Sequence, residues 1–535
     1  MRKLVDPQQT RLFDPFDSVL TEHTRRRLLN DWPGVFRHVL LELMPAGALA
    51  DHFDPGMGRP SKELYSMAGL IFLKECFDWT KDQAVDAYCF HMNVHYALNL
   101  EPVAQDMSMR TLERYIAYFE DDELAKAVMA DVTVRLVGLL ELKIDTQRLD
   151  STHIFSDMAS FGRTRLMGVT NKRFLTQVKR HDPASYEALD ASLRRRYCPG
   201  INQLFADVAK DSDSRRLLRQ QVAEDMHTLI RRFSDHPRHA GKDTYKAMVR
   251  IFYEQCDVQE EKVTVKARTG GHVMQNPSDA DATYDGHKGP GYQVQLSEAC
   301  NPENEVQLIT CAIPQTAVDS DGNAMEPVLD TLEQTELLPE AFIADTLYCS
   351  DENVQRAEQR SVELVGPVSG SDKANENASY EQLTIDDFDI DEDTEDVKCC
   401  PAGHAPESSV VDEQTEKTTT VMPNSACSQC EYYAPCPVEK CKGQYRLEHT
   451  AKQRRLAARR REQNTEVFRH RYKIRGGIEG TNSGLKRKTG LGQLRVRGAP
   501  AVFHAIYLKV AGWNMLRAAV CAKMRKIVYQ RAYQA

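Results

Sequence analysis

Apolar residues recur at intervals of three and four along the first 140 residues, the spacing of helices with one buried face. One run follows Ser61, a residue type that caps helices, and another follows Thr80-Lys-Asp-Gln83, which has the composition of a capping box. A third run begins at Ser108. The apolar positions of the three runs are Leu64, Met67, Leu70 and Ile71; Ala84, Val85 and Tyr88; and Leu112, Tyr115, Ile116 and Phe119. We therefore predict an all-α N-terminal domain over residues 1–140.

Beyond residue 140 the pattern changes to short apolar runs bounded by turn-forming residues, which is typical of strands. These runs lie at residues 143–155, 292–296, 306–313, 341–344 and 362–366. A charged stretch at 159–260 has helical character instead, and an amphipathic helix is expected at residues 325–337. Strands that alternate with helices predict a mixed α/β fold, here interrupted by a helical insertion.

Charge is distributed unevenly along the 535 residues, although the net charge of −9 would by itself argue against a nucleic-acid partner. From Lys442 onward there are 23 lysines and arginines and four acids, whereas the stretch from Asp372 to Lys398 holds eleven acids and two lysines. Such segregation is typical of nucleic-acid binders. We expect the acidic run Asp386-Asp-Phe-Asp-Ile-Asp-Glu-Asp393 within the stretch from Asp372 to Lys398 to be a mobile linker, and the arginines at 454–461 to follow DNA phosphates.

Neither a membrane-length apolar run nor a signal-peptide core follows Met1, so we expect a cytoplasmic protein, associated with the nucleoid if it binds DNA. The chain is long enough for several domains. The patterns divide it into the N-terminal helices (1–140), the first part of an α/β core (141–368), an acidic and cysteine-rich insertion (369–445) and a basic C-terminal part (446–535).

Six of the fourteen cysteines cluster within about forty residues, which in a cytosolic chain indicates metal binding rather than disulfides. Cys427 and Cys430 have the spacing of a zinc hairpin, and Cys400-Pro-Ala-Gly resembles a zinc knuckle. The favoured tetrad for a structural zinc ion is Cys400, Cys427, Cys430 and Cys436. Cys399, His404 and Cys441 are substitutes. The alternative is that all are free thiols in a loop.

Five polar residues near the C-terminus are spaced so that they would share one face of a helix. They are Tyr472, Arg475, Glu479, Asn482 and Lys486. Glycines at 476, 477, 480 and 484 leave little bulk beside this face, which suits close approach by a phosphate backbone. One carboxylate among cations indicates either a metal ligand flanked by phosphate contacts or a solvated surface face.

The spacing of Tyr472, Arg475, Glu479 and Lys486 resembles the Tyr-Arg-Glu-Lys signature of DDE transposases encoded by bacterial insertion sequences. The resemblance implies an RNase H-like catalytic core and two upstream catalytic acids on strands. Asp150-Ser-Thr fits the first block. Asp345 fits the second, in which Tyr348 is present but Thr346-Leu347 replace the usual small residues.

The resemblance further implies that Asp150, Asp345 and Glu479 hold two Mg²⁺ (or Mn²⁺) ions for DNA phosphodiester cleavage and strand transfer. Arg475, Lys486 and Tyr472 would contact DNA at the terminal inverted repeats, target DNA would be the second substrate, and a homodimer would pair the two ends. Two alternatives stay open. They are an inactive or domesticated protein that binds DNA ends, and a metal-dependent endonuclease without strand transfer.

Three further cations are candidates for DNA contacts. Lys288 follows a block, Asp281-Ala-Thr-Tyr-Asp-Gly-His287, that resembles one seen in many such transposases; it contacts a phosphate or merely belongs to a glycine-rich hairpin. Arg110 and Arg114 would point outward from a helix that either reads transposon ends as part of a helix-turn-helix or serves only packing. Asp281 is expected to cap a turn.

Overall fold

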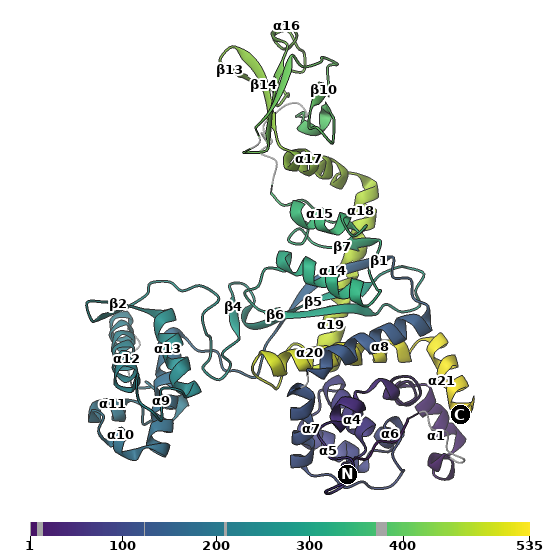
Figure 1. Ribbon diagram of the computed structural model, residues 1–535, viewed down its shortest axis with the longest axis vertical. Coiled ribbons are helices and arrows are strands. Elements are labelled where there is room, and N and C mark those ends of the chain that lie inside the picture. Colours follow the sequence, from purple (N-terminus) through teal and green to yellow (C-terminus); the bar gives the residue numbers. More distant parts are fainter. Residues whose placement is uncertain are drawn as a thin grey trace.

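The computed structural model describes residues 2–7, 14–121, 123–207, 211–370, 382–412 and 414–534. Figure 1 shows a central sheet, N-terminal helices beneath it, a helical unit to one side and a small β-rich unit at the far end of a helical stalk. None of the described helices combines the length and apolarity needed to cross a bilayer.

The central sheet is mixed, which confirms the predicted mixed α/β class. Its order is β6-β5-β1-β7-β8, with β4 pairing with the start of β5. The neighbours β6, β5 and β1 are antiparallel, whereas β7 and β8 run parallel to β1. The strands are β1 (Thr146–Ile154), β4 (Thr283–Asp285), β5 (Gly289–Ala299), β6 (Ile309–Thr316), β7 (Ala341–Ile343) and β8 (Glu363–Val365).

Helices pack on the sheet and continue into the N-terminal unit. The helix α14 (Met325–Gln334) contacts β6, and α15 (Asp351–Glu358) contacts β8. On the other side of the sheet lie α8 (Leu124–Leu140), α19 (Gly477–Thr489) and α20 (Ala499–Ala519) (Figure 1). One continuous apolar core joins the sheet, these helices, α21 (Ala522–Gln534) and the N-terminal helices. The N-terminal helices are α1 (Glu22–Leu29), α2 (Trp32–Val35), α3 (Ala46–Ala50), α4 (Leu64–Cys76), α5 (Lys81–Phe90), α6 (Met92–Ala97) and α7 (Met109–Asp121).

Of the helix caps predicted at Thr80 and Ser61, the first is confirmed and the second is wrong. Thr80 and Gln83 form the predicted capping box at the start of α5. Ser61 does not cap α4; Glu63 does, because its carboxylate accepts hydrogen bonds from the first free N–H groups of the helix. The Ser61 hydroxyl instead accepts a hydrogen bond from the N–H of Lys3, 58 positions away along the chain. A long-range contact therefore displaced the local one.

A buried lysine ties the N-terminal helices to the C-terminal ones. The side chain of Lys509 on α20 is 2% exposed, and its Nζ lies 3.0 Å from Asp78 Oδ1. The same Nζ donates to the carbonyl of Thr489, the last residue of α19, at 2.6 Å. A buried charge needs such partners, since it has lost its water. Lys509 therefore holds the end of α19 against α4.

The residues inserted between β1 and β4 form a helical unit with its own apolar core, which extends from Leu166 to Met274. It lies beside the sheet in Figure 1. Its elements are α9 (Arg163–His181), α10 (Pro183–Glu187), α11 (Ala191–Arg196), α12 (Ser212–Phe233), α13 (Asp243–Gln255), β2 (Cys256–Gln259) and β3 (Lys262–Val265).

Among its described residues, the cysteine-rich unit has a core of six buried apolar side chains. Its elements are η6 (Ile385–Asp387), β9 (Asp389–Ile390), β10 (Val397–Cys399), β11 (Ser408–Asp412), β12 (Lys417–Met422), α16 (Asn424–Cys427), β13 (Glu439–Cys441) and β14 (Gln444–His449). The stalk helices α17 (Ala451–Gln463) and α18 (Glu466–Tyr472) lead from it back to the sheet.

The described part of the acidic stretch is folded, which corrects the expectation of a mobile linker; residues 372–381 lie outside the described residues. Its acids form ion pairs with α17: Arg454 with Glu395 at 2.9 Å and Arg461 with Asp386 at 3.0 Å. Arg455 pairs with Asp351 of α15 at 2.8 Å. These arginines, expected to follow DNA phosphates, have carboxylate partners within the chain.

Candidate active site

Two adjacent parallel strands carry Asp150 and Asp345 to the same level of the sheet. Arg148 of β1 is the register partner of Ile343 of β7. Asp150 and Asp345 each follow their register residue by two positions, so continuing the register places them side by side. Both are half-buried. The parallel pairing therefore brings together two carboxylates that are almost two hundred residues apart in sequence.

Two side chains of the C-terminal signature segment reach these carboxylates. The Nη2 atom of Arg475 lies 3.0 Å from Asp150 Oδ1 and 3.6 Å from Asp345 Oδ2. The amide of Asn482 donates to Asp150 Oδ2 at 3.2 Å. Arg475 thus supplies positive charge between two carboxylates that would otherwise repel each other.

Burial raises the pKa of Asp150 above its usual value. The Arg475 guanidinium opposes this shift, and the nearby carboxylates of Asp345 and Asp321 add to it. An ionised carboxylate that is buried near other carboxylates is destabilised by lost solvation and by repulsion. A bound cation offsets both effects, so such a carboxylate favours cation binding.

Asp321, in the short helix η5 (Asp321–Ala324), is a carboxylate of the site that sequence analysis missed. Its Oδ2 accepts a hydrogen bond from Ser151 Oγ at 3.0 Å, and its Oδ1 accepts one from Gln295 Nε2 at 2.8 Å. The buried Tyr348 hydroxyl donates to the same Gln295. The sequence signal that could have identified Asp321 is its position a few residues after the end of a strand.

Glu479 lies on α19, three residues before Asn482. Arg475 lies in the preceding 3-10 turn η7 (Lys473–Gly476) and Tyr472 ends α18, so the five residues predicted to share one helix face are divided among three consecutive elements. Glu479 is exposed and forms no hydrogen bond or ion pair with the described residues. Arg475 and Asn482 anchor this segment to Asp150, but among the described residues Asp150, Asp345 and Glu479 do not form a group of ligand atoms within 4.8 Å of one another.

The glycines around Glu479 divide into two kinds. A Cβ atom on Gly477 would meet the Arg148 guanidinium at 1.9 Å, and one on Gly484 would meet the Trp513 ring at 2.6 Å. Those two glycines permit close packing of α19 against β1 and α20. A Cβ atom on Gly476 or Gly480 would meet nothing within 4 Å. Open space at Gly476 and Gly480 agrees with the predicted room beside the helix face.

Three of the predicted DNA-contacting residues border this group. Burial raises the pKa of Tyr472, opposed by Arg475 and increased by Asp345, and its ring stacks on Phe468. Lys288 Nζ lies 3.4 Å from the Ser151 hydroxyl, next to Asp150. Burial, followed by the charge of Lys288, lowers the pKa of Lys486. Lys288 and Lys486 therefore lie close to one another beside β1.

Arg110 and Arg114 are not brought to this group. Both are exposed on α7, which packs among the N-terminal helices below α20, whereas the sheet lies above it (Figure 1). The prediction that Asp281 caps a turn is wrong, because Asp281 binds the N-terminus of a helix instead. Its carboxylate accepts a hydrogen bond from the N–H of Ala499 at 3.0 Å, at the start of α20.

The four favoured cysteines line one small cavity, together with His404. Burial raises the pKa of Cys427 to about 11, and the nearby thiols of Cys436, Cys400 and Cys430 contribute to the shift. The donor set suits zinc. Within the described residues no three of these sulfur atoms lie within 4.8 Å of one another, so they would draw closer to bind one ion. Cys399 and Cys441 do not line the cavity.

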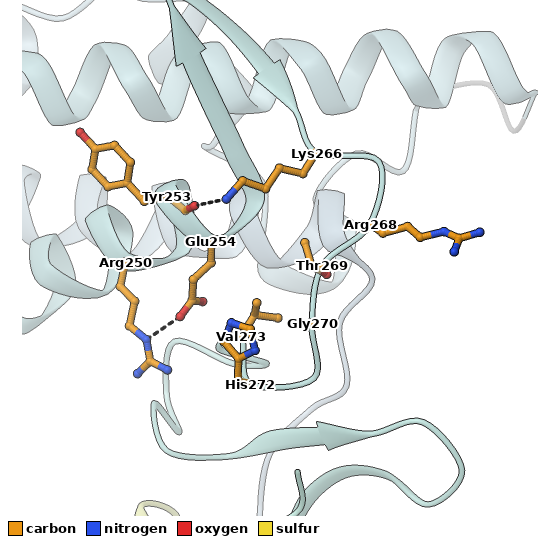
Figure 2. A pocket seen from close by; sticks show the side chains of 9 residues that line it. All are labelled: Arg250, Tyr253, Glu254, Lys266, Arg268, Thr269, Gly270, His272 and Val273. Carbon is orange, nitrogen blue, oxygen red and sulfur yellow. Dashed lines mark hydrogen bonds and ion pairs between the residues drawn. The ribbon is translucent and has the colours of Figure 1, made fainter. Parts of the chain in front are cut away.

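A surface cavity in the helical unit, lined by α13 and the segment after β3, is basic (Figure 2). Its Arg250 pairs with Glu254 at 2.7 Å, and its Lys266 donates to the Tyr253 carbonyl at 2.7 Å. Arg268 extends away from the other side chains. Two of its cations are thus engaged within the protein, and it lacks the converging carboxylates found at the sheet.

Residues 399–519 match the family model described as "Transposase DDE domain". The match covers the cysteines, the stalk and α19 with Glu479, but neither Asp150 nor Asp345. Among solved structures, the chain is similar to the piggyBac transposase in a synaptic complex with hairpin DNA, at 10% identity over 69% of this chain and 71% of that chain. The TM-score of 0.22 is too low to support an argument. No curated protein sequence matches the chain significantly.

Over residues 399–519, less than a quarter of its length, the chain is therefore similar to the transposase DDE domain.

Proposed function

We propose that the protein cuts DNA at the ends of a bacterial insertion sequence and joins the freed 3'-hydroxyl groups to target DNA. The proposed catalytic carboxylates are Asp150, Asp345 and Glu479. The proposed core is an RNase H-like sheet. The strand order supports this assignment, because an antiparallel β6-β5-β1 meander is extended on the other side of β1 by two parallel strands.

One observation carries the proposal: Arg475 and Asn482, which flank Glu479, contact Asp150, and Arg475 also approaches Asp345. Three chain segments that the signature resemblance predicts to cooperate therefore meet. If the signature segment were only a solvated surface helix, none of its residues would need to contact both aspartates.

The carboxylates fit a pair of hard divalent cations, Mg²⁺ or Mn²⁺, which prefer oxygen ligands. When bound, such ions activate an attacking oxygen and stabilise a leaving oxygen at phosphorus. Arg475 competes for the same oxygens, so its guanidinium must leave Asp150 and Asp345 as cations bind. Arg475 would then be free to bind a DNA phosphate. Lys486 and Lys288, beside β1, would bind phosphates in the same way.

The proposed partners are the terminal inverted repeats, target DNA and a second copy of the chain that pairs the two ends. Tyr472 would pack against the DNA backbone beside Arg475. Arg110 and Arg114 would contact DNA away from the catalytic group, on the N-terminal helices. A structural zinc ion held by Cys400, Cys427, Cys430 and Cys436 would stabilise the cysteine-rich unit, whose apolar core is small. The proposed location is the cytoplasm, at the nucleoid.

The test uses DNA that carries the inverted repeats flanking the gene, with Mg²⁺. Asp150→Asn, Asp345→Asn and Glu479→Gln should each reduce cleavage by at least about a hundred-fold, since each removes a charged metal ligand. The matched control is Asp157→Asn, an exposed acid just past β1 that pairs with Arg497 at 2.8 Å. Full cleavage by any of the three variants contradicts the proposal.

A second assay supplies ends that are already cut and measures their joining to target DNA. Joining that depends on the same three carboxylates supports strand transfer. Cleavage without joining identifies a metal-dependent endonuclease, and binding of the repeats without either reaction identifies an inactive end-binding protein.

A further inference from the structure

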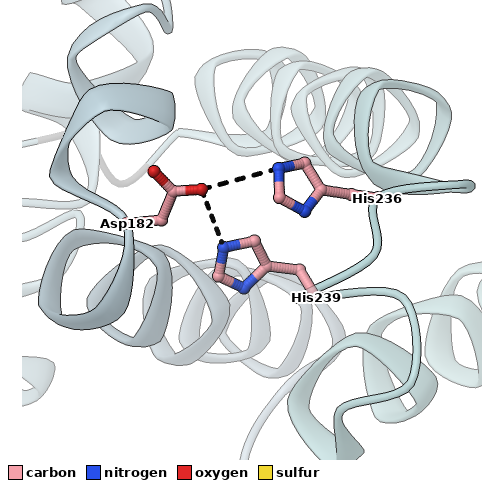
Figure 3. A group of neighbouring side chains, drawn as sticks. All are labelled: Asp182, His236 and His239. Carbon is pink, nitrogen blue, oxygen red and sulfur yellow. Dashed lines mark ion pairs between the residues drawn. The ribbon is translucent and has the colours of Figure 1, made fainter.

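The helical unit contains a group of one aspartate and two histidines, remote from the acidic site in sequence (Figure 3). Asp182 lies at the junction of α9 and α10, where it caps α10. His236 and His239 lie in the loop between α12 and α13. Their candidate ligand atoms all lie within 4.8 Å of one another.

The distances in this group suit a shared ion better than direct hydrogen bonds. The Nε2 atoms of His236 and His239 each lie 3.5 Å from the same oxygen, Asp182 Oδ2. Hydrogen bonds between such atoms are about 2.7–3.2 Å long. Ligands bonded tetrahedrally to zinc at about 2.1 Å are separated from each other by about 3.4 Å. Both histidines therefore stand at the separation expected for co-ligands.

His239 is buried without satisfying its polar atoms. Its side chain is 1% exposed, and neither ring nitrogen has a hydrogen-bond partner among the described residues. Its ring is held edge-on against Phe174 and Phe233, with interplanar angles of 85°. A buried imidazole without partners is costly, and each such group needs an explanation. A bound cation would supply the missing partner for Nε2.

The other two residues are held in place but keep ligand capacity. Asp182 Oδ1 accepts from the N–H of Ser185 at 3.2 Å, and Oδ2 accepts from the Ser185 hydroxyl at 2.8 Å, which leaves a lone pair on Oδ2. His236 Nδ1 accepts a long bond of 3.3 Å from the Arg238 N–H. A cation on Nε2 would move the ring proton to Nδ1, so this weak bond would break. His239 also lines a surface cavity.

We propose that Asp182, His236 and His239 form a site for a divalent transition-metal ion, with zinc preferred, separate from the acidic site and the cysteine cluster. The ligands are one carboxylate oxygen and two imidazole nitrogens, a set that suits zinc among the metals imidazole binds. A solvent molecule completes the fourth position. The ion joins the α9–α10 junction to the α12–α13 loop, and so closes one end of the helical unit.

The experiment measures bound zinc by mass spectrometry in full-length protein without an affinity tag, dialysed in excess Mg²⁺ so that the acidic site is filled. Cys427→Ser and Cys430→Ser are introduced together to remove the cysteine cluster. We expect one zinc ion per chain to remain. His239→Gln and Asp182→Asn should each weaken zinc binding at least ten-fold.

Asp182→Asn is the variant that should fold, since asparagine also caps helices and accepts the bond from Ser185. The control is His227→Gln, on α12, whose ring stacks on Phe252 and lies outside the group. Zinc should raise the melting temperature of the control and of the parent, but not that of Asp182→Asn.

A parallel measurement keeps all cysteines and uses cobalt-loaded protein. Asp182→Asn should remove one cobalt ion without changing the thiolate-to-cobalt absorption of the cysteine cluster. The proposal is overturned if the cysteine-deficient parent retains no zinc, or if His239→Gln and Asp182→Asn bind zinc as tightly as the parent does.

Discussion

The acidic site and the cysteine cluster are built in opposite ways. The proposed catalytic carboxylates Asp150, Asp345 and Glu479 come from three distant segments, on a sheet and a helix that share the large apolar core. The cysteines lie within one short segment around six buried apolar side chains. The acidic site therefore needs no ion to hold its frame, whereas the cysteine cluster has little besides its thiols to hold it together.

The sharpest test of this difference is zinc removal. Cys427→Ser should unfold the cysteine-rich unit locally, because a structural zinc ion contributes on the order of 10 kcal/mol. Hydrogen exchange should accelerate over residues 382–450 but not over β1, β5 and β6. The matched control is Cys441→Ser, which removes an exposed thiol outside the cavity. Unchanged exchange in Cys427→Ser would show that the thiols are free.

Loss of the Lys509 side chain, which holds the end of α19 against α4, should have the next largest effect. Lys509→Ala leaves the Thr489 carbonyl without its donor and Asp78 with Arg495 alone, so the free energy of unfolding should fall by about 1–3 kcal/mol. Lys526→Ala, at an exposed position on the neighbouring α21, is the control and should change it by less than about 0.5 kcal/mol. Denaturant unfolding measures both. Equal effects in the two variants would mean that α19 is held by apolar packing alone.

Asp321 should matter for the reaction without holding the fold. Asp321→Asn keeps an acceptor for Ser151, loses the one for Gln295 and removes a charge near Asp150, so we expect cleavage to fall about ten- to a hundred-fold. The melting temperature should fall by only a few degrees, since one hydrogen bond is lost. Asp319→Asn is the comparison, since Asp319 caps the end of β6 through Thr316 instead. A cleavage rate unaffected by Asp321→Asn would remove this residue from the site.

The smallest expected effect is that of Arg475→Gln on metal binding in the absence of DNA. Arg475→Gln removes the competing cation, so Mn²⁺ should bind several-fold more tightly, as expected for about 1 kcal/mol. Because the folded protein raises the pKa of Asp150, protons compete with the metal above the usual aspartate range, and binding should weaken as pH falls. Titration followed by electron paramagnetic resonance measures both. The Arg471→Gln control, which breaks an ion pair with Glu363, should bind Mn²⁺ like the parent.

Features that depend on near neighbours could be predicted from the sequence. Helical spacing predicted that Glu479, Asn482 and Lys486 lie on one helix, which is α19, but it did not predict the 3-10 turn that separates Arg475 from that helix. The Thr80 capping box and the short spacing of the cysteines are local in the same sense. The strands could also be predicted from their apolar runs, because these runs can be recognised without knowing which strands pair.

Contacts between distant segments could not be predicted in this way. The register that sets Asp150 beside Asp345 depends on how two strands pair, and Asp321 enters the site only because β6 returns along β5. Asp182 meets two histidines more than fifty residues later only once α9 and α12 have packed. The α17 arginines, which resemble a DNA-binding surface in sequence, are paired with acids for the same reason. Local spacing specifies which side chains share an element, whereas burial of the common apolar core specifies which elements meet.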